Sequence, residues 1–379
     1  MKVLVTGGAG FIGSHTVDLL LEKGYKVKVL DLLQKRVHPY GKPRYLSSDI
    51  EFIQGDVADK EAMSKALEGV EGVFHLAAYQ DYMTDFSNFI RANTLSTALI
   101  FEIIVEKKLN VEKIVLASSQ STYGEGKYTC KIHGIQYPDS RSLEQLEKSD
   151  WEMHCTEAGC TNYLEPVLID EAVTNPFTAY GISKEALERL SNKLGKRYSI
   201  PTVSMRYSIV QGPRNSFFNA YSGVCRIFTL RLINNKPPVI YEDGKQLRDY
   251  VHVLDVAAAN ILAFENPKCN HSALNVGGTA GTNLLDYTKV LIKVAGKNIE
   301  PLIPRYFRYG DTRHTVSSSE KLKSLGWKNK YTLEDIFRDY LKWVHEQPDV
   351  KDRYEEVEEI MKKQSVLRQV KSLIKETRK

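Results

Sequence analysis

Residues 2–31 read KVLVTGGAGFIGSHTVDLLLEKGYKVKVLD, and this stretch decides the fold of the chain. A short β-branched run, Lys2–Thr6, meets a group of glycines and then an apolar-periodic stretch, Phe11–Glu22, which predicts a strand, a glycine loop and a helix. In such a loop Gly7 permits the tight turn, Gly10 lets the backbone approach a pyrophosphate, and a third glycine lets helix and strand pack closely. The stretch therefore predicts a dinucleotide-binding unit.

The next predicted strand, Lys26–Leu30, ends at Asp31. A carboxylate at this position accepts hydrogen bonds from both hydroxyls of an adenosine ribose and repels a 2′-phosphate, so it favours NAD over NADP. Lys35 and Arg36 lie nearby and leave NADP open as an alternative. A purely structural glycine turn beside a solvated aspartate is the other interpretation, and the strand, loop and helix context argues against it.

Strands and helices continue to alternate after this unit. Further strands are predicted over residues 50–54, 72–76, 113–117 and 201–206, and further helices over 60–67 and 89–107. This alternation predicts an α/β fold of the Rossmann type, a doubly wound parallel sheet. Ligands of such sheets bind beyond the carboxyl ends of the strands, so the cofactor side is expected to include Asp56, Ala77, Ser118 and Ser119.

A second set of polar residues predicts proton transfer. Asn175 and Pro176 predict the start of a helix, and Tyr180 and Lys184 then share one face of it, four residues apart. A lysine ammonium and a nicotinamide cation both favour the phenolate form of tyrosine, so the pair predicts a proton shuttle. Ser119 is expected to hydrogen-bond the same substrate oxygen. Such a Tyr and Lys taken singly would more often mark an exposed helix face.

Several motifs together resemble the extended short-chain dehydrogenase/reductase family, which includes NAD-dependent nucleotide-sugar epimerases and dehydratases. The resemblance covers about residues 1–345. It rests on TGGAGFIGSH from Thr6, HLAA from His75, SSQSTYG from Ser118, YGISK from Tyr180, RYSIVQGPR from Arg206, DGKQLRDYVHVLDVA from Asp243 and RYGD from Arg308.

The resemblance implies an NAD-binding Rossmann domain over 1–206, with an insertion at 125–170 and a return segment at 250–264, and a smaller α/β domain over 207–345 for a nucleoside diphosphate sugar. Ser119, Tyr180 and Lys184 are implied to be catalytic. Besides the residues above, NAD is implied to contact Phe11, Ile12, Val57 and Asn93, together with Tyr180 and Lys184.

The substrate diphosphate is expected to meet two arginines. Arg248 and Arg308 are the candidates for clamping it, because guanidinium forks match phosphate oxygens. Asp311 is expected to bind a ribose or to hold Arg308. As isolated residues, all three would more often be members of surface ion pairs.

The reaction implied by the resemblance is 4-epimerisation through a transient 4-keto sugar. Dehydratases of the family carry an Asp-Glu pair where this chain has Gln120 and Ser121, which disfavours dehydration. The chain most resembles enzymes of the dTDP-L-rhamnose/dTDP-6-deoxy-L-talose 4-epimerase type. Ile209 stands where the family has Asn, and the loop Tyr79–Tyr82 has polar and aromatic residues of its own. Both are expected to lie near the sugar. A pyranose/furanose mutase and a UDP-glucose 4-epimerase therefore remain alternatives, with an NAD(H)-exchanging reductase or a silent NAD sensor less favoured.

The insertion carries three of the five cysteines. Cys130 and His133 form a C-x2-H pair, and Cys155 and Cys160 form a C-x4-C pair, which together predict a structural zinc site. His154 is an alternative ligand. The plainer interpretation is a set of thiols and a histidine scattered in a tyrosine-rich loop. The insertion is expected to cover the sugar pocket.

The end of the chain is strongly charged. Residues 364–379 hold five basic side chains against Glu376, a net +4 of the formal +5, so the rest is near neutral and a nucleic-acid partner is not expected. Residues 346–379 predict a charged amphipathic helix, with Val357, Ile360, Leu367, Val370 and Ile374 on one face, which packs on the body or supports a homodimer.

Membrane insertion and secretion are not expected either. No segment reaches the ~18 continuous apolar residues of a membrane span. The first strand begins at Lys2, which leaves no room for a signal peptide, so a cytoplasmic protein is expected.

Overall fold

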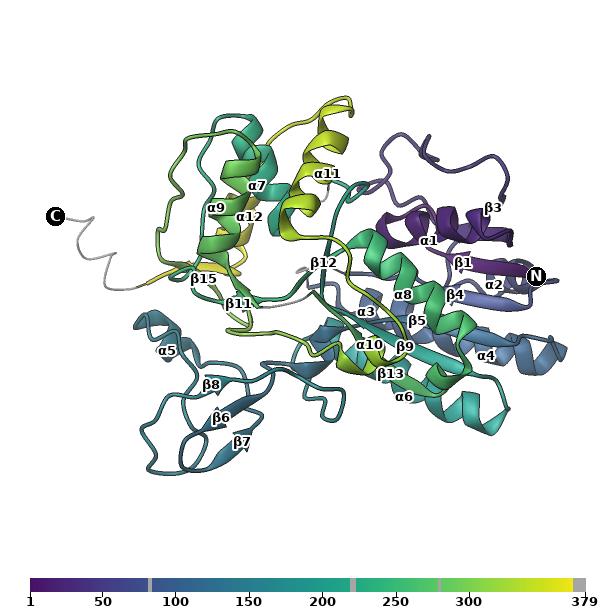
Figure 1. Cartoon of the computed structure of the whole chain (residues 1–379), viewed down its shortest axis with the longest axis horizontal. Helices are drawn as coiled ribbons and strands as arrows, with labels where there is room; N and C mark the ends of the chain where they lie inside the picture. The colour runs from purple at the N-terminus through teal and green to yellow at the C-terminus, as the bar shows by residue number, and fades with distance from the viewer. Residues whose placement is uncertain (81–83, 219–222, 279–280, 371–379) are drawn as a thin grey trace.

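The computed structural model describes residues 1–80, 84–218, 223–278 and 281–370. Its centre is a seven-stranded parallel sheet with the strand order β13-β9-β5-β4-β1-β2-β3 (Figure 1). The strands are β1 (Lys2–Thr6), β2 (Lys26–Asp31), β3 (Glu51–Gln54), β4 (Gly72–His75), β5 (Lys113–Ser119), β9 (Thr202–Tyr207) and β13 (Ser272–Val276). The predicted doubly wound α/β sheet is confirmed, and its order reverses between β1 and β4, where such folds bind ligands.

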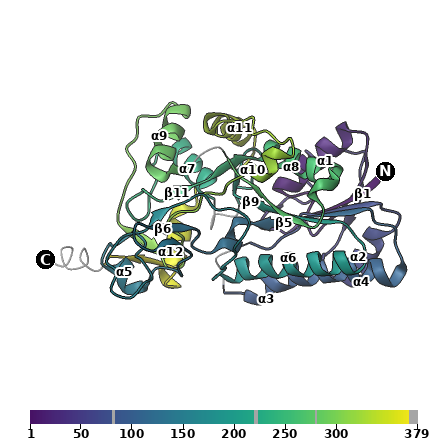
Figure 2. The same ribbon diagram turned by 60° about the horizontal axis from the view of Figure 1, so that its bottom comes forward.

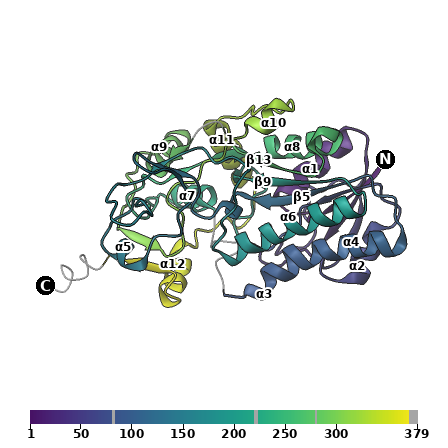
Figure 3. The same cartoon turned by 90° about the horizontal axis from the view of Figure 1, so that it is seen from below.

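Helices cover both faces of the sheet (Figure 3). One face carries α1 (Phe11–Glu22) and α8 (Val253–Glu265), and the other carries α2 (Lys60–Leu67), α4 (Ser96–Lys107) and α6 (Ala179–Arg197). Alternate strand residues enter the two cores, so Val3 and Val5 pack toward one layer while Leu4 packs toward the other. Both layers therefore bury the strands, which explains their nearly continuous apolar sequences.

One described helix is long and apolar enough to cross a membrane by length and composition alone. It joins α3 (Phe86–Phe89), the π-helical turn η1 (Ile90–Leu95) and α4. Half of its most apolar window is buried in the fold, where Leu99, Ile100 and Ile103 belong to the core beneath the sheet. Packing against the sheet thus accounts for its apolar character.

The second part of the chain lies beside the sheet and has its own core (Figure 1). Its larger helices are α7 (Val224–Ile233), α9 (Leu284–Val294) and α11 (Leu333–His345). Two short strand pairs accompany them, β10 (Ile209–Gln211) with β12 (Tyr250–His252) and β11 (Leu247–Arg248) with β14 (Thr282–Asn283). The short elements η2 (Gln120–Tyr123), η3 (Pro267–Cys269) and α10 (Glu320–Ser324) complete the connections.

The insertion forms a small lobe of its own (Figures 1 and 2). It contains α5 (Leu143–Glu147) and an antiparallel sheet of β6 (Tyr128–Cys130), β7 (Gly134–Gln136) and β8 (Glu165–Pro166), in the order β7-β6-β8. The lobe touches the end of the chain, because Leu146 and Trp151 share a buried cluster with Phe307 and Val370.

The single helix predicted over 346–379 is wrong. Helix α12 spans Tyr354–Lys363, Ser365 then adopts a left-handed conformation with φ 57°, and β16 (Leu367–Gln369) pairs antiparallel with β15 (Tyr306–Arg308). A strand partner from much earlier in the chain thus overrides the local helical pattern. Ile374 lies outside the described residues. The apolar side of α12 packs on the same chain, and the homodimer stays a prediction.

The place of one strand and the start of one helix differ from the sequence prediction. Strand β13 joins the central sheet although its residues fall in the range assigned to the smaller domain. Helix α6 begins at Ala179, capped by Thr178, whose Oγ1 accepts a hydrogen bond from Gly181 N at 3.0 Å. The predicted start at Asn175 and Pro176 is wrong, because residues 173–177 are not helical; there Asn175 N donates to the carbonyl of Thr122 at 3.0 Å.

Candidate functional site

A cavity of about 1190 Å³ opens at the carboxyl ends of the central strands and extends to β15. It brings together residues that are far apart in the sequence. Those predicted from the sequence that line it are Gly7, Gly10, Phe11, Ile12, Asp31, Asp56, Val57, Ala77, Ser118, Ser119, Tyr180, Lys184, Arg248, Arg308 and Asp311.

The glycine loop forms a backbone cradle at one end of this cavity. Gly7 has φ 69°, and a Cβ on it would lie 2.8 Å from the Cα of Ala77. The carboxylate of Asp31 is fixed beside the loop, because Oδ2 accepts from Ala9 N at 3.0 Å and Oδ1 accepts from Leu33 N at 2.8 Å. Each oxygen keeps a lone pair for a ribose hydroxyl, so the cradle and the carboxylate fit the pyrophosphate and adenosine of NAD.

Asn93 does not lie among the residues that line the cavity. It is buried in the π-helical turn η1, and its amide joins two other elements. Its Nδ2 donates to Ser183 Oγ at 2.9 Å and to the carbonyl of Tyr79 at 3.1 Å, and its Oδ1 accepts from Tyr79 N at 2.9 Å. Asn93 therefore connects the loop after β4 to helix α6. The resemblance implied instead that Asn93 contacts NAD directly.

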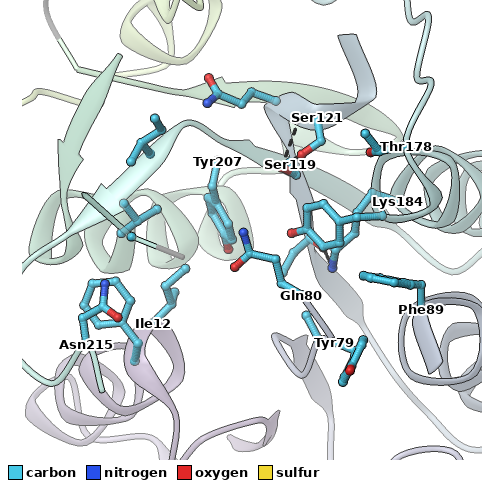
Figure 4. A pocket seen from close by; sticks show the side chains of 18 of the residues that line it. Ile12, Tyr79, Gln80, Phe89, Ser119, Ser121, Thr178, Lys184, Tyr207 and Asn215 are labelled. Atoms are coloured by element: carbon cyan, nitrogen blue, oxygen red, sulfur yellow. Dashed lines mark hydrogen bonds between the residues drawn. The ribbon is translucent and has the colours of Figure 1, made fainter. Parts of the chain in front are cut away.

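Ser119, Tyr180 and Lys184 meet at the middle of the cavity. Ser119 lies at the end of β5, with its Oγ 2.7 Å from Ser121 Oγ (Figure 4). Lys184 Nζ donates to the carbonyl of Ala117 at 2.8 Å and lies 5.7 Å from the ring centroid of Tyr180. At this separation the Lys184 ammonium acts on the Tyr180 phenol through its charge.

Burial dominates the titration of this pair. Burial raises the pKa of Tyr180 to about 12, and its hydrogen bond with Ser119 acts in the opposite direction. Burial lowers the pKa of Lys184 to about 7, which Glu188 partly offsets. In the protein alone Tyr180 is therefore a phenol at neutral pH, so the phenolate predicted from the sequence depends on the nicotinamide cation as well as on Lys184.

Aromatic and amide side chains surround this centre, among them Tyr79 and Gln80 of the loop predicted to lie near the sugar. Tyr79, Gln80 and Phe89 approach the space beside Lys184 (Figure 4). The rings of Phe89 and Tyr180 meet edge to face at 6.3 Å. Thr178 and Asn215 also lie here, and a local signal exists for Thr178, since a threonine before an apolar-periodic run is a common helix cap. Asp81 and Tyr82 of the predicted sugar loop lie outside the described residues.

The far end of the cavity is rich in arginine. Arg308 Nε donates to Asp311 Oδ2 at 2.8 Å, which is the pairing expected if Asp311 holds Arg308. Arg248 donates to the carbonyls of Leu247 and Arg313, both at 2.9 Å, and of Thr312 at 2.6 Å, so its guanidinium also fixes backbone. Gln246, inside the motif that begins at Asp243, also lines the cavity. The quoted motifs do not include five further lining residues: Arg226, Tyr241, Tyr354, Val357 and Met361.

A buried charge network joins the insertion to this arginine-rich end. Arg313 is fully buried and pairs with Glu242 at 3.0 Å and with Asp243 at 2.7 Å, as well as with Glu152 of the insertion. Arg141, also in the insertion, pairs with Glu242 at 2.8 Å and donates to the carbonyl of Asp311 at 2.9 Å. The insertion therefore supports the loop that follows Arg308.

The predicted metal ligands also converge. Cys130, His133, Cys155 and Cys160 place one donor atom each within 4.8 Å of one another. His154, the alternative ligand, is engaged elsewhere, because its Nε2 lies 2.6 Å from Asp150 Oδ2. All five cysteines are free thiols in the structure.

Comparisons with known proteins agree with this arrangement. The chain matches the model of the NAD dependent epimerase/dehydratase family over residues 3–143 and 158–277, and the break between them falls in the insertion. It is 31% identical over 358 residues to a dTDP-L-rhamnose 4-epimerase of Burkholderia thailandensis, which covers 93% of this chain and 97% of that protein.

Solved structures give the same picture. The UDP-glucose 4-epimerase of Thermotoga maritima, crystallised with UDP-glucose, matches with a TM-score of 0.75 and 29% identity over 91% of this chain and 99% of that one. The UDP-glucose 4-epimerase of Thermus thermophilus in complex with NAD matches with a TM-score of 0.70 and 29% identity, over 90% and 98% of the two chains.

Proposed function

This chain belongs to the NAD dependent epimerase/dehydratase family and is an NAD-dependent nucleotide-sugar 4-epimerase, and we propose that its substrate is dTDP-L-rhamnose or the C4 epimer dTDP-6-deoxy-L-talose. The observation that carries the assignment of chemistry is the meeting of Ser119, Tyr180 and Lys184 with the glycine cradle in one cavity. The sugar assignment draws support from the Burkholderia thailandensis relative.

In the proposed reaction, Tyr180 takes the proton of the 4-hydroxyl while Ser119 hydrogen-bonds the same oxygen. The glycine cradle and Asp31 would hold NAD, which would supply the hydride acceptor and then the hydride donor for C4, so the epimerisation needs no net oxidant. Tyr180 then gives the proton back, and Lys184 holds the nearby backbone in place. No step needs the zinc ion predicted from the cysteine pairs, so such an ion would serve structure alone.

The surroundings of Tyr180 support a 6-deoxy sugar. The aromatic rings of Phe89, Phe177 and Tyr79 line the same cavity as its hydroxyl. A methyl group suits such a wall better than a hydroxymethyl group, because burying an unpaired hydroxyl costs free energy.

The test is proton NMR of the purified holoenzyme with dTDP-L-rhamnose, UDP-galactose and UDP-glucose in parallel. Inversion at C4 of dTDP-L-rhamnose, with much slower turnover of both UDP-sugars, is the expected result. Faster turnover of the UDP-sugars would assign the enzyme to the UDP-glucose 4-epimerases that it also resembles. Ring contraction without inversion at C4 would identify a mutase.

Replacement of Asp31 by alanine is expected to weaken NAD binding about 10- to 150-fold, because a hydrogen bond to a charged group contributes about 1.5–3 kcal/mol. The measurement is NAD released on denaturing the purified variant, followed by titration of the cofactor-depleted protein. Asp49→Ala, in the exposed loop before β3, is the matched control and should keep the wild-type NAD content. Equal NAD content in both variants would contradict the role proposed for Asp31.

A further inference from the structure

The insertion holds a compact cluster of four possible metal ligands. Cys130 ends β6 and His133 lies in the turn to β7, while Cys155 and Cys160 lie in the loop before β8. The side chains of Cys130 and Cys155 are buried, Cys160 is partly buried and His133 is exposed. Both halves of the lobe thus contribute two ligands each.

The distances between these atoms suit tetrahedral zinc. With zinc bonds of ordinary length, a sulfur and a nitrogen ligand should lie about 3.6 Å apart and two sulfur ligands about 3.8 Å apart. His133 Nδ1 lies 3.6 Å from Cys130 Sγ and 3.3 Å from Cys155 Sγ. All four donor atoms lie within 4.8 Å of one another, so a zinc ion fits with adjustments of less than a bond length.

Polar neighbours already orient the sulfur atoms. Gln136 Nε2 donates to Cys155 Sγ at 3.2 Å, and its Oε1 accepts from Thr156 N at 3.1 Å. Such supporting hydrogen bonds are typical of metal sites, where they fix the direction of each ligand. Gln136 therefore links β7 to the loop that carries Cys155.

Around the four ligands the lobe has only a small apolar core of its own, apart from the contacts of Arg141, Leu146, Trp151 and Glu152 with the body. Its buried apolar cluster consists of Tyr128, Cys130, Met153, Cys155 and Leu164, with Cys160 packed beside it. Three of these six side chains are the cysteines themselves, and no disulfide joins the five cysteines, all of which lie within the described residues. A core this small rarely supports an ordered lobe without a metal ion or a disulfide.

We propose that Cys130, His133, Cys155 and Cys160 bind one structural zinc ion, which orders the insertion and, through it, the arginine-rich end of the cavity. The connection runs from β6, where Tyr128 OH accepts from His314 N at 3.1 Å, to the loop that follows Asp311. The network of Arg141, Glu152 and Arg313 runs parallel to it.

Metal analysis of the full chain, purified without chelator or metal-affinity resin, tests the site. One zinc per chain is expected in the wild-type protein. His133→Ala should fall well below half an equivalent, whereas His154→Ala, in the same lobe but paired with Asp150, should keep the full equivalent. Zinc below a tenth of an equivalent in wild-type protein from zinc-supplemented culture, or equal loss in both variants, would overturn the proposal.

Cobalt replacement keeps the test independent of variant folding. Wild-type protein stripped of metal under reducing conditions and reloaded with Co²⁺ should show thiolate charge-transfer and tetrahedral d–d absorption. Alkylation of the three ligand thiols, those of Cys130, Cys155 and Cys160, should abolish these bands. Bands of octahedral cobalt, or a disulfide among the three cysteines in freshly prepared protein, would contradict the site.

The link to the cavity rests on the proposed function and has a separate readout. Metal-free wild-type protein should show a KM for the nucleotide sugar raised at least fivefold with bound NAD unchanged, and zinc should restore it. If the wild-type protein binds one zinc per chain but its KM does not change when the zinc is removed, the link to the cavity is wrong and the metal site still stands. A failure of the sugar assignment would leave the zinc content and the cobalt spectrum unaffected.

Discussion

Replacing Tyr180 with phenylalanine is expected to lower kcat about 10²- to 10⁴-fold, the usual contribution of a positioned general base. The substitution removes one oxygen atom from a buried side chain whose ring still packs against Phe89, so folding and bound NAD should be retained. The loss should therefore appear in kcat far more than in KM, because the hydroxyl acts in the transition state of proton transfer and contributes little to substrate binding. Steady-state kinetics with NAD content measured on the same sample would show this.

Tyr207→Phe is the matched control. Tyr207 lines the same cavity, but its hydroxyl is already engaged, because it donates to Asn260 Oδ1 at 2.7 Å. Its loss should lower kcat less than about tenfold. A Tyr180→Phe enzyme with more than a tenth of wild-type kcat would contradict the proposed proton transfer, as would an equal effect of the two substitutions.

The features predicted well from the sequence depend on residues close together in the chain. The glycine loop, helix α1 and the strand that ends at Asp31 are contiguous, and each is specified by local pattern and by backbone sterics. The alternation of strands and helices then allowed only a few topologies, since parallel strands need crossover helices. The same contiguity explains why Cys130 lies close to His133 and Cys155 close to Cys160, while the zinc ion itself stays a prediction.

The features missed depend on contacts between distant residues. Strand β16 exists because β15 offers an edge, and nothing near Leu367 in the sequence signals that edge. Helix α6 is capped by Thr178 and not by Asn175, whose backbone N–H donates to the carbonyl of the distant Thr122. Arg313 carries no motif at all, and its importance appears only when the insertion and the loop around Glu242 are folded onto each other.

The C-terminal segment that contains α12 and β16 lies closer to the proposed sugar site than its sequence indicates, and the insertion, expected to cover the sugar pocket, reaches the same region. Both pack against β15, which carries Arg308, although one precedes that strand in the chain and the other follows it. Tyr354 and Met361 of α12 line the cavity itself. A charged terminal segment thus closes one wall of the proposed sugar site instead of forming a separate appendage.

Replacement of Arg313 by methionine is expected to reduce the free energy of unfolding by about 3 kcal/mol, at the lower end of the roughly 3–5 kcal/mol typical for breaking a buried ion pair. Glu152 and Asp243 are partly exposed, with 39% and 28% of their side chains accessible, and can turn toward water. Glu242 is only 4% exposed and cannot, although Arg141 still pairs with it, which limits the loss. Urea unfolding followed by circular dichroism measures the change.

Arg338→Met is the control, because Arg338 makes its ion pair with Asp335 at 2.6 Å on the surface, where such pairs contribute about 0–1 kcal/mol. If Arg313→Met costs no more than Arg338→Met, the buried network does not hold the insertion to the body. If it costs about 3 kcal/mol and also raises KM for the nucleotide sugar, the network transmits order to Asp311, since Arg141 donates to the carbonyl of that residue. The two effects together would show that one network of buried charges both stabilises the insertion and orders the sugar site.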